Sequence, residues 1–307
     1  MNILIAGGSG LIGRALIQKL SDSGHQIAIL SRNPAKVPGV PESVQVIGWD
    51  SKTTAGWGAV VNQMDVIVNL AGAPLNGNGL LDIWLTERRK HDVLHSRLDA
   101  ATALLDAVEQ GQNRPSAFLQ ASAVGYYGAH GDEVIVESGD AGSDFLSSVQ
   151  VQAEQVSARA ANLGMRHIIF RTGLVLDGNE GALQYFKLQH ALFVGGKMGS
   201  GKQYYSWIHL EDEAAALQFL IENQQASGAY NLTAPNPVTN AEFSKILGRV
   251  MKRPSYFPVP AFLLRLVLGE VSMVVLEGQR VIPDRLLNEG FEFQYANLEN
   301  ALQDVLN

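Results

Sequence analysis

A short glycine-rich segment near the start of the chain has the spacing of a phosphate-binding turn. The apolar run 3–6 has the length of a β-strand, the turn 7–13 follows it, and an amphipathic helical pattern continues to about Leu20. Glycine permits the sharp turn and lets backbone N–H groups approach a pyrophosphate with no Cβ in the way. The start of the helix offers unpaired N–H donors and a partial positive charge. We therefore predict that a dinucleotide binds here, on Gly7, Gly10, Leu11, Ile12 and Gly13.

The residues that end the second predicted strand bear on which nucleotide is bound. NAD-specific folds usually place Asp or Glu about twenty residues past the glycines, where the carboxylate holds the ribose 2′-hydroxyl. This chain carries Ser31 and Arg32 after the apolar run 27–30. A guanidinium forks onto phosphate oxygens through two hydrogen bonds, which suits the 2′-phosphate of NADP(H). We predict NADP(H) as the cofactor, with Ser31 and Arg32 as ligands. NAD is the less favoured cofactor, and a solvated arginine is the alternative role for Arg32.

The composition is that of a compact globular protein and excludes several kinds of function. Of the 307 residues, 46% are hydrophobic and only 17% are charged, so a large core is expected rather than disorder. The net charge of −7 comes with scattered basic residues, which argues against nucleic acid as a partner. The absence of cysteine excludes disulfides, thiol catalysis and cysteinyl metal sites. The histidines do not cluster, and we predict no metal site.

No segment has the pattern of a signal peptide or a membrane span. The apolar run 3–6 is too short for a signal peptide. The stretch 262–276 is interrupted by Arg265, Gly269 and Glu270, and so falls short of the roughly 20 apolar residues that cross a bilayer. We therefore expect a packed helix in this stretch, no membrane partner and a cytoplasmic location.

Further apolar runs of strand length alternate with helical patterns along the first half of the chain. The runs lie at 44–47, 65–70, 117–121 and 167–170, and helices are expected at about 83–109 and 144–162. Strands separated by helices of crossover length form a parallel sheet that is covered on both faces. The predicted fold class is therefore α/β, a Rossmann-type doubly wound sheet. In such sheets the ligand lies past the carboxyl ends of the strands.

The sequence changes character after about residue 170. Glycine-rich loops alternate with short helical patterns, and the C-terminal part is mainly helical. We divide the chain into a nucleotide-binding domain, 1–170, and a smaller, mainly helical substrate-side portion, 171–307. The segment 230–232 is expected to return to the main sheet as a further strand.

These motifs together resemble the extended short-chain dehydrogenase/reductase superfamily, in its epimerase-like branch, over essentially the whole chain. The superfamily motifs are the nucleotide turn 6–13, the fourth-strand motif 69–72 and an aromatic–Ile–His–x–x–Asp signature within 206–212. The segments 125–128, 171–176 and 276–283 are similar to one epimerase-like subfamily with a small C-terminal domain of unknown function. The resemblance implies that Leu70, Ala71 and Gly72 lie against the adenosine half of the cofactor and that Asp50 contacts its adenine.

The catalytic signature of the superfamily is absent from this chain. Family members carry Tyr-x-x-x-Lys on the helix after the fifth strand, where the lysine lowers the pKa of the tyrosine and binds ribose. Alignment on Glu154 places Leu146 at the tyrosine position and Gln150 at the lysine position. Neither replacement can transfer a proton. Ser122, at the usual hydroxyl position after the fifth strand, is retained.

Other residues could take over the missing roles. Tyr126 and Tyr127 follow Ser122 closely and could supply the proton, or they could pack as aromatic residues under a loop. Glu154 could approach the nicotinamide ribose in place of the lysine, or lie exposed on its helix. Arg97 could reach the cofactor phosphates if its long helix faces the cleft, or lie on the surface. The candidate catalytic residues are Ser122, Tyr126 and Tyr127, and Arg97 and Glu154 join the candidate cofactor ligands.

Two functions remain open from the sequence. The first is an NADP(H)-dependent, epimerase-like oxidoreductase that acts on a small polar substrate, of which a sugar or nucleotide would be an example. The second is a non-catalytic NADP(H)-binding protein with a regulatory or scaffold role. The missing Tyr-x-x-x-Lys pair favours the second, whereas Ser122 and a full substrate-side portion favour the first. We expect a small molecule as partner, with a homodimer as a candidate assembly.

Overall fold

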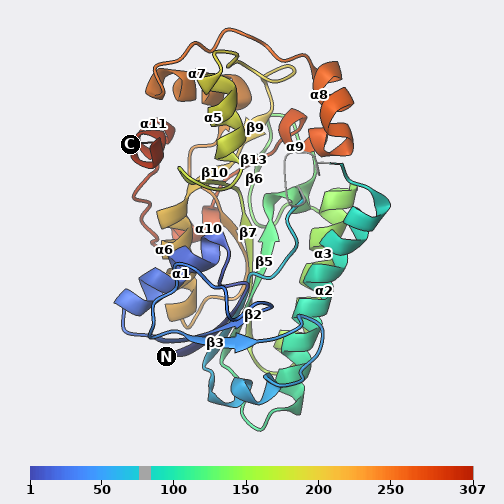
Figure 1. The fold of residues 1–307 in the computed structure, drawn as a ribbon, viewed down its shortest axis with the longest axis vertical. Coiled ribbons are helices and arrows are strands. Elements are labelled where there is room, and N and C mark those ends of the chain that lie inside the picture. Colours follow the sequence, from blue (N-terminus) through green and yellow to red (C-terminus); the bar gives the residue numbers. More distant parts are fainter. Residues whose placement is uncertain (76–83, 307) are drawn as a thin grey trace.

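Seven parallel strands form one sheet at the centre of the computed structural model, which describes residues 1–75 and 84–306 (Figure 1). Their order across the sheet is β11-β7-β5-β4-β1-β2-β3. The strands are β1 (Asn2–Ala6), β2 (Gln26–Ser31), β3 (Gln45–Gly48), β4 (Val66–Asn69), β5 (Ala117–Ala123), β7 (Arg166–Thr172) and β11 (Gly228–Leu232). The predicted doubly wound α/β sheet is confirmed, and the segment 230–232 lies in it because β11 pairs with β7.

Helices cover both faces of this sheet. Those that pack directly on it are α1 (Leu11–Asp22), α2 (Glu87–Gln110), α3 (Phe145–Ser157) and α6 (Leu210–Glu222). Figure 1 shows α1 and α6 on one side of the sheet and α2 and α3 on the other. Two short helices, η1 (Gly58–Gln63) and α4 (Arg159–Asn162), complete this layer.

The two faces have separate cores because side chains alternate along each strand. On β1, Ile3 and Ile5 belong to the core that includes Leu16 of α1 and Leu217 of α6. The intervening Leu4 belongs to the core on the opposite face, against α2. All of these side chains are fully buried. Burial on both faces explains why the strands read as continuous apolar runs.

Capping residues set the helix boundaries. α2 begins after Thr86, whose hydroxyl accepts a hydrogen bond from the Arg89 N–H at 3.2 Å. The predicted start at residue 83 lies outside the described residues. α3 begins after Asp144, whose carboxylate accepts from the Ser147 N–H at 2.9 Å. It ends at Ser157, where we expected one helix to continue to residue 162.

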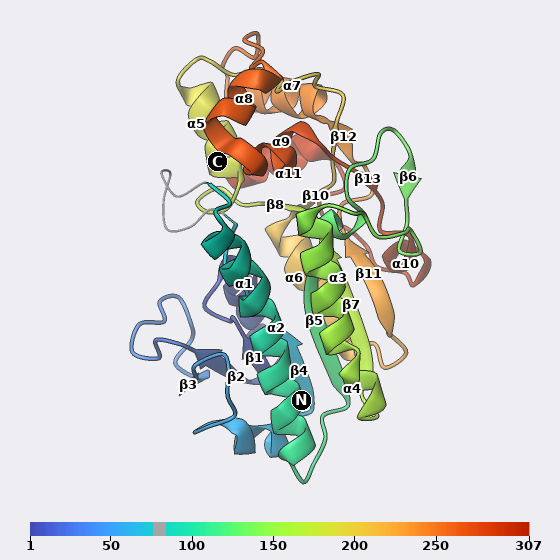
Figure 2. The ribbon, with the colours of Figure 1, turned by 90° about the vertical axis from the view of Figure 1, so that its right-hand side faces the viewer.

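Most of the remaining elements lie at one end of the sheet, where Figure 1 and Figure 2 show α5, α7, α8 and α9 together, whereas α10 lies beside β11. The helices are η2 (Val124–Tyr127), α5 (Leu183–Ala191), α7 (Asn240–Val250), α8 (Ala261–Leu268), η3 (Gly269–Ser272), α9 (Met273–Leu276), α10 (Asp284–Asn288) and α11 (Leu298–Leu306). The short strands are β6 (Val134–Ile135), β8 (Leu174–Leu176), β9 (Tyr204–Tyr205), β10 (Trp207–His209), β12 (Val238–Thr239) and β13 (Arg280–Val281). They pair as β10-β8, β12-β9 and β13-β6.

The late aromatic–Ile–His–x–x–Asp signature ties the C-terminal segment to the sheet. The Asp212 carboxylate accepts hydrogen bonds from the backbone N–H groups of Gln294 and Tyr295, both at 2.9 Å. The His209 ring stacks on Tyr295 with 3.8 Å between ring centres, and its Nε2 lies 3.2 Å from the Asp304 carboxylate. Its Nδ1 accepts from the N–H of residue 211 at the start of α6. In this chain the signature therefore anchors the C-terminus.

The stretch 262–276 corrects one expectation. It is helical, as predicted, but α8 has no buried side chain, and Phe262 and Leu266 are 71% and 69% exposed. The interruptions at 265 and 269–270 fall within and just after α8. Across the described part of the chain, no helix combines the length and apolar character needed to cross a bilayer.

The stability of the fold should depend on the ionisation of Glu213, a fully buried residue on α6. Its Oε1 accepts a hydrogen bond from the Thr172 hydroxyl at 2.7 Å, and its Oε2 has no partner among the described residues. Burial raises the pKa of this carboxyl from 4.5 to about 8. Between these values the folded protein retains a proton that the unfolded chain has released, so stability falls as the pH rises.

We expect Glu213→Gln to remove this pH dependence. At pH 5 the free energy of unfolding of the variant should be close to that of wild type. By pH 8 it should exceed the wild-type value by on the order of 3–5 kcal/mol, because wild type loses stability over this range. Urea unfolding at pH 5, 6.5 and 8 measures the difference. Glu42→Gln, at an exposed glutamate, is the matched control. A constant difference between Glu213→Gln and wild type at all three pH values would show that Glu213 does not titrate in this range.

Candidate functional site

The glycine turn joins β1 to α1 through close backbone contacts. Gly7 has φ +79°, and a Cβ there would lie 2.7 Å from the carbonyl carbon of Leu70. A Cβ at Gly13 would lie 2.6 Å from the Cα of Gly8, inside the turn. These two positions therefore require glycine for the fold itself. Gly10 differs, because a Cβ there would meet only the Gly7 carbonyl oxygen, at 3.3 Å. The space in front of Gly10 is open to a ligand.

The start of α1 offers free hydrogen-bond donors. Gly10 occupies the N-cap position with no side-chain cap, and the first turn of the helix has no acidic residue. Within the described residues, no hydrogen bond engages the N–H groups of Leu11, Ile12 or Gly13. Arg14 holds the turn from outside, donating to the Ser9 carbonyl and to Glu180, both at 2.7 Å. An oriented, uncapped helix N-terminus suits an anionic group such as a pyrophosphate.

Arg97 places a positive charge at the end of β4, next to the segment whose Leu70 and Ala71 lie against Gly7. Its Nη1 donates to the carbonyls of Ala73, at 3.1 Å, and Val93, at 2.8 Å. A Cβ on Gly72 would come within 3.0 Å of its guanidinium carbon. Burial lowers the pKa of Arg97 to about 10, and no carboxylate of the described residues pairs with it. Arg97 is therefore half-buried, and α2 turns it toward Gly72 and the cavity, where it has no carboxylate partner among the described residues.

The residues predicted at the adenosine end lie at the edge of β2 and β3. Ser31 is buried, and its hydroxyl accepts a hydrogen bond from the Asn33 N–H at 3.2 Å. Arg32 is exposed, with no hydrogen bond or ion pair to another described residue. Asp50 closes a local turn by accepting from the N–H groups of Lys52 and Thr53, both at 2.8 Å, and these bonds lower its pKa to about 2. Contacts of these side chains with a cofactor stay predictions.

A buried ion pair lies behind the end of β5. Arg171 of β7 donates to both carboxylate oxygens of Glu154 on α3, at 3.0 and 2.9 Å. Burial works against the charged guanidinium, but hydrogen bonds and charge from Glu154 outweigh it and raise the pKa of Arg171. The Ser122 hydroxyl donates to Glu154 at 2.6 Å. Glu154 is therefore buried rather than exposed on its helix, because three elements converge on it.

The two neighbouring tyrosines occupy different environments. Tyr127 is 1% exposed, and its hydroxyl donates to Asn231 at 2.6 Å and accepts from Arg171 at 3.0 Å. Burial raises the pKa of Tyr127. Tyr126 is half-buried, with its ring 3.5 Å from the guanidinium carbon of Arg171, and its hydroxyl makes no hydrogen bond to another described residue. The geometry therefore favours Tyr126 over Tyr127 as a proton donor, and leaves Tyr127 the role of a packed aromatic residue.

A cavity of about 340 Å³ lies at the carboxyl end of the sheet. Leu146 and Gln150 of α3 both line it, so the positions aligned with the family's tyrosine and lysine face this cavity. The Gln150 Oε1 is buried and has no partner among the described residues. Arg97 also lines the cavity. Residues 123–125 and 128–129 form a further wall, and Tyr126 lies between these two lining segments without being a lining residue itself.

Sequence reasoning did not identify two parts of this site. The segment 273–279 lines the cavity from the far end of the chain, held by hydrogen bonds from the Tyr205 hydroxyl to the Val275 carbonyl and from the Ser206 hydroxyl to the Gln279 carbonyl. Arg171 was part of a family-like motif but carried no assigned role. The sequence did offer a signal for the role of Arg171. A single arginine at the end of an apolar strand carries a charge into the interior, where it needs a buried partner of opposite charge.

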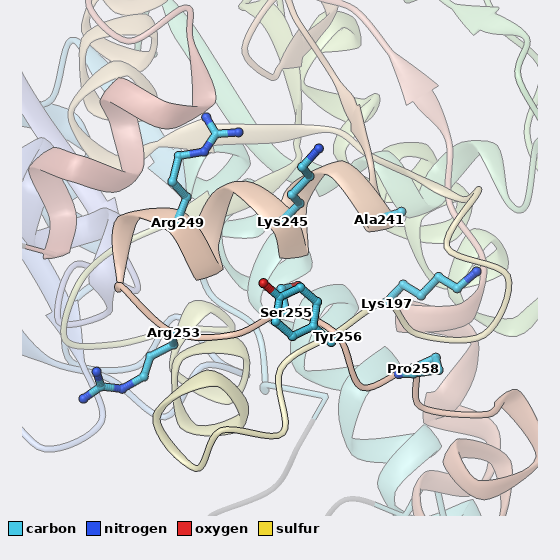
Figure 3. Close-up of a pocket in the computed structure, with 8 residues that line it drawn as sticks. All are labelled: Lys197, Ala241, Lys245, Arg249, Arg253, Ser255, Tyr256 and Pro258. Atoms are coloured by element: carbon cyan, nitrogen blue, oxygen red, sulfur yellow. The ribbon is translucent and has the colours of Figure 1, made fainter.

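A second cleft, of about 590 Å³, lies away from the sheet, along α7 (Figure 3). Its cationic side chains are Lys197, Lys245, Arg249 and Arg253. Figure 3 shows them pointing in different directions, so they do not converge on one ligand position. Arg249 is paired with Glu299 at 2.6 Å, and the Arg253 guanidinium lies over a phenylalanine ring. The cavity at the sheet is therefore the better candidate site.

Two known family descriptions together cover almost the whole chain. Residues 3–233 match the NAD-dependent epimerase/dehydratase family, and residues 259–305 match a domain of unknown function. That second domain contains the segment 273–279 that closes the cavity. An epimerase family protein of Staphylococcus haemolyticus is 39% identical over 99% of this chain and 98% of its own length. A Bacillus subtilis epimerase family protein, YfhF, is 36% identical over 100% of this chain and 98% of its own.

Solved structures agree with this grouping. The human epimerase family protein SDR39U1, crystallised with NADPH, superposes with a TM-score of 0.88 at 32% identity, covering 100% of this chain and 99% of that one. The UDP-glucose 4-epimerase of Thermus thermophilus, in complex with NAD, superposes with a TM-score of 0.79 over 99% and 98% of the two chains; at 17% identity it shows the fold alone. This chain belongs to the NAD-dependent epimerase/dehydratase family, in the group that carries the C-terminal domain of unknown function.

Proposed function

We propose that this protein is an NADP(H)-dependent oxidoreductase that acts on a small molecule held in the cavity at the carboxyl end of the sheet. The observation that carries the proposal is the uncapped N-terminus of α1, supported by Arg97, a half-buried cation next to Gly72 that has no carboxylate partner among the described residues. Together they fit the pyrophosphate of a dinucleotide, because free N–H donors and a fixed positive charge both require an anion. NADPH supplies a hydride when it is bound. The human relative crystallised with NADPH supports this choice of cofactor.

Arg32 should decide the preference for NADPH over NADH. Arg32→Ala is expected to weaken NADPH binding roughly ten- to a hundredfold and to leave NADH binding unchanged, because only NADPH carries the 2′-phosphate. A charge-assisted, two-pronged contact contributes about 1.5–3 kcal/mol. Isothermal titration with both cofactors measures the difference. Arg265→Ala, which removes an exposed arginine on α8, is the control for lost charge. An equal loss for both cofactors in Arg32→Ala would contradict the assignment.

Protonation of the reduced substrate is assigned to Tyr126. Its hydroxyl has no partner among the described residues, while the Arg171 guanidinium over its ring supplies positive charge close to the phenol. Ser122 cannot donate freely, because its proton is directed to Glu154. Its oxygen still has lone pairs that accept hydrogen bonds. Glu154 and Arg171 therefore act as positioning residues that hold Ser122 and Tyr126 at the end of β5.

The two tyrosines provide a matched test of this assignment. Tyr126→Phe should lower kcat for NADPH-dependent carbonyl reduction at least tenfold without changing stability. Tyr127→Phe should instead lower the free energy of unfolding by about 1–3 kcal/mol, because Asn231 and Arg171 lose a buried partner. Ser122→Ala should lower kcat as well. NADPH fluorescence and urea unfolding measure the two effects, and unchanged rates in Tyr126→Phe and Ser122→Ala would exclude this site.

A non-catalytic role is the second candidate function. The observation that favours it is the pair Leu146 and Gln150, which face the cavity in place of a proton donor and its lysine. In that case the protein would bind NADPH tightly and respond to the NADPH/NADP ratio without turnover. Tight NADPH binding combined with no oxidation of NADPH across a broad panel of carbonyl compounds would support this role over the first.

A further inference from the structure

We propose that the cavity binds a small, mainly apolar molecule with one hydrogen-bond acceptor, such as a carbonyl oxygen, and not a nucleotide sugar. This inference rests on the proposed function only in placing the substrate in this cavity. It departs from the small polar substrate suggested by the sequence. It also sets this chain apart from the nucleotide-sugar enzymes that share its fold.

The walls of the cavity are largely apolar and come from four helices. α2 contributes Val93, α3 contributes Leu146 and Val149, α5 contributes Phe186, and α9 contributes Met273 and Val275. Val93 and Val149 are fully or almost fully buried, so they form the floor rather than the rim. An apolar wall of this kind stabilises a ligand by removing its apolar surface from water, and gives a sugar hydroxyl no partner.

Most polar side chains that line the cavity already bond to the protein. The Tyr205 hydroxyl donates to the Val275 carbonyl at 3.0 Å, and the Ser206 hydroxyl donates to the Gln279 carbonyl at 2.7 Å. The Thr172 hydroxyl donates to Glu213 at 2.7 Å. Asp144 caps α3 through its bonds to Ser147. These groups hold the walls in place and are not free to recognise a ligand.

Few polar groups remain for a substrate. The Gln150 side chain makes no hydrogen bond to another described residue, so its Nε2–H group can donate to a ligand carbonyl and its Oε1 can accept from a ligand hydroxyl. Arg97 is the only cation among the described lining residues, and the proposed function assigns it to the cofactor. The other polar side chains of the lining are Gln279, Tyr204, whose hydroxyl bonds to Asp132, and the exposed Glu277. One or two amide groups can hold a single carbonyl but cannot satisfy the many hydroxyls of a sugar.

The charge of the lining and the volume of the cavity also argue against a nucleotide sugar. A nucleotide sugar carries two phosphates, and beyond Arg97 the described lining offers no cation to neutralise them, whereas Glu277 adds a negative charge at the exposed rim. A volume of about 340 Å³ lies near the lower end for small-molecule sites and must also admit the reactive end of NADPH. The remaining room suits a small ketone or aldehyde.

Direct binding to the NADP⁺-loaded full-length protein tests the inference independently of turnover. Acetophenone, cyclohexanone and 2-decanone are titrated alongside UDP-glucose, with affinity read by isothermal titration. We expect saturable binding of at least one ketone and no binding of UDP-glucose. Titration of NADPH into the free protein comes first, because its failure would count against the proposed function and not against the character of the cavity.

Two matched valines localise the ketone to this cavity. Val274 lines it and is 46% exposed, whereas Val267 on α8 is 51% exposed and does not line it. Both positions accept a charge without loss of the core. Val274→Asp should weaken ketone binding at least tenfold, and Val267→Asp should leave it unchanged. Saturable UDP-glucose binding, no binding of any ketone, or equal behaviour of the two variants would each overturn the proposal.

Discussion

Gly10→Val is expected to abolish NADPH binding while the protein remains folded. A Cβ at this position would meet only the Gly7 carbonyl oxygen, at 3.3 Å, and the backbone φ of −77° is one that valine readily adopts. The methyl groups would occupy the open space before the free N–H groups of α1, where the pyrophosphate should lie. Isothermal titration should show a loss of affinity of at least a hundredfold, with a thermal unfolding midpoint close to that of wild type.

The neighbouring glycines serve as controls. Gly10→Ala adds only the Cβ and should weaken NADPH binding less than Gly10→Val does. Gly13→Ala would place a Cβ 2.6 Å from the Cα of Gly8, so it should lower stability as well as affinity. Wild-type affinity in a folded Gly10→Val variant would mean that the cofactor does not bind at this turn.

The sheet and the nucleotide turn could be predicted because their signals are local. The apolar runs that form β1, β2, β4, β5 and β7 are continuous, as expected of strands buried on both faces, and glycine spacing reports directly on backbone conformation. Helix ends were less well predicted. The start of α3 was predicted to within one residue, at its cap Asp144, but its end was not, because the break after Ser157 divides what reads as one helical pattern.

The polar interior of the site could not be predicted from local pattern. Glu154 and Arg97 lie on helices, and the sequence does not show which face of each helix is buried. Packing decides it: Glu154 meets Arg171 of β7, and Arg97 meets Gly72 at the end of β4. Met273 and Val275 reach the cavity through contacts with residues about seventy positions earlier in the chain, such as Tyr205. Pairings of that separation leave no periodic signal, so the C-terminal wall became visible only in three dimensions.

The absence of the usual proton donor suggests a gain-of-function experiment. Leu146 and Gln150 lie four residues apart on α3 and therefore share one face, and both line the cavity. Ser122 remains at the family's hydroxyl position. A lysine at 150 would lie one turn before Glu154, whose carboxylate, already paired with Arg171, still offers negative charge nearby. The double variant Leu146→Tyr/Gln150→Lys thus rebuilds the missing pair where a ligand can reach it.

In a Tyr126→Phe background, where the donor proposed for wild type is absent, we expect this double variant to reduce carbonyl compounds with NADPH at least a hundredfold faster than Tyr126→Phe alone, since a positioned general acid contributes about 10²–10⁴-fold. Leu146→Phe/Gln150→Lys is the matched control, because it has the same ring and the same lysine but no phenolic proton. Both variants fill the cavity to a similar degree, so any change in substrate binding affects them alike, and only the phenol can separate their kcat values. Comparable NADPH oxidation rates in the two variants would show that the cavity wall at Leu146 does not meet the reacting carbonyl. A large difference would show that the cavity wall at Leu146 meets the reacting carbonyl, so that this chain retains the geometry of a reductase at the position of the family's usual proton donor.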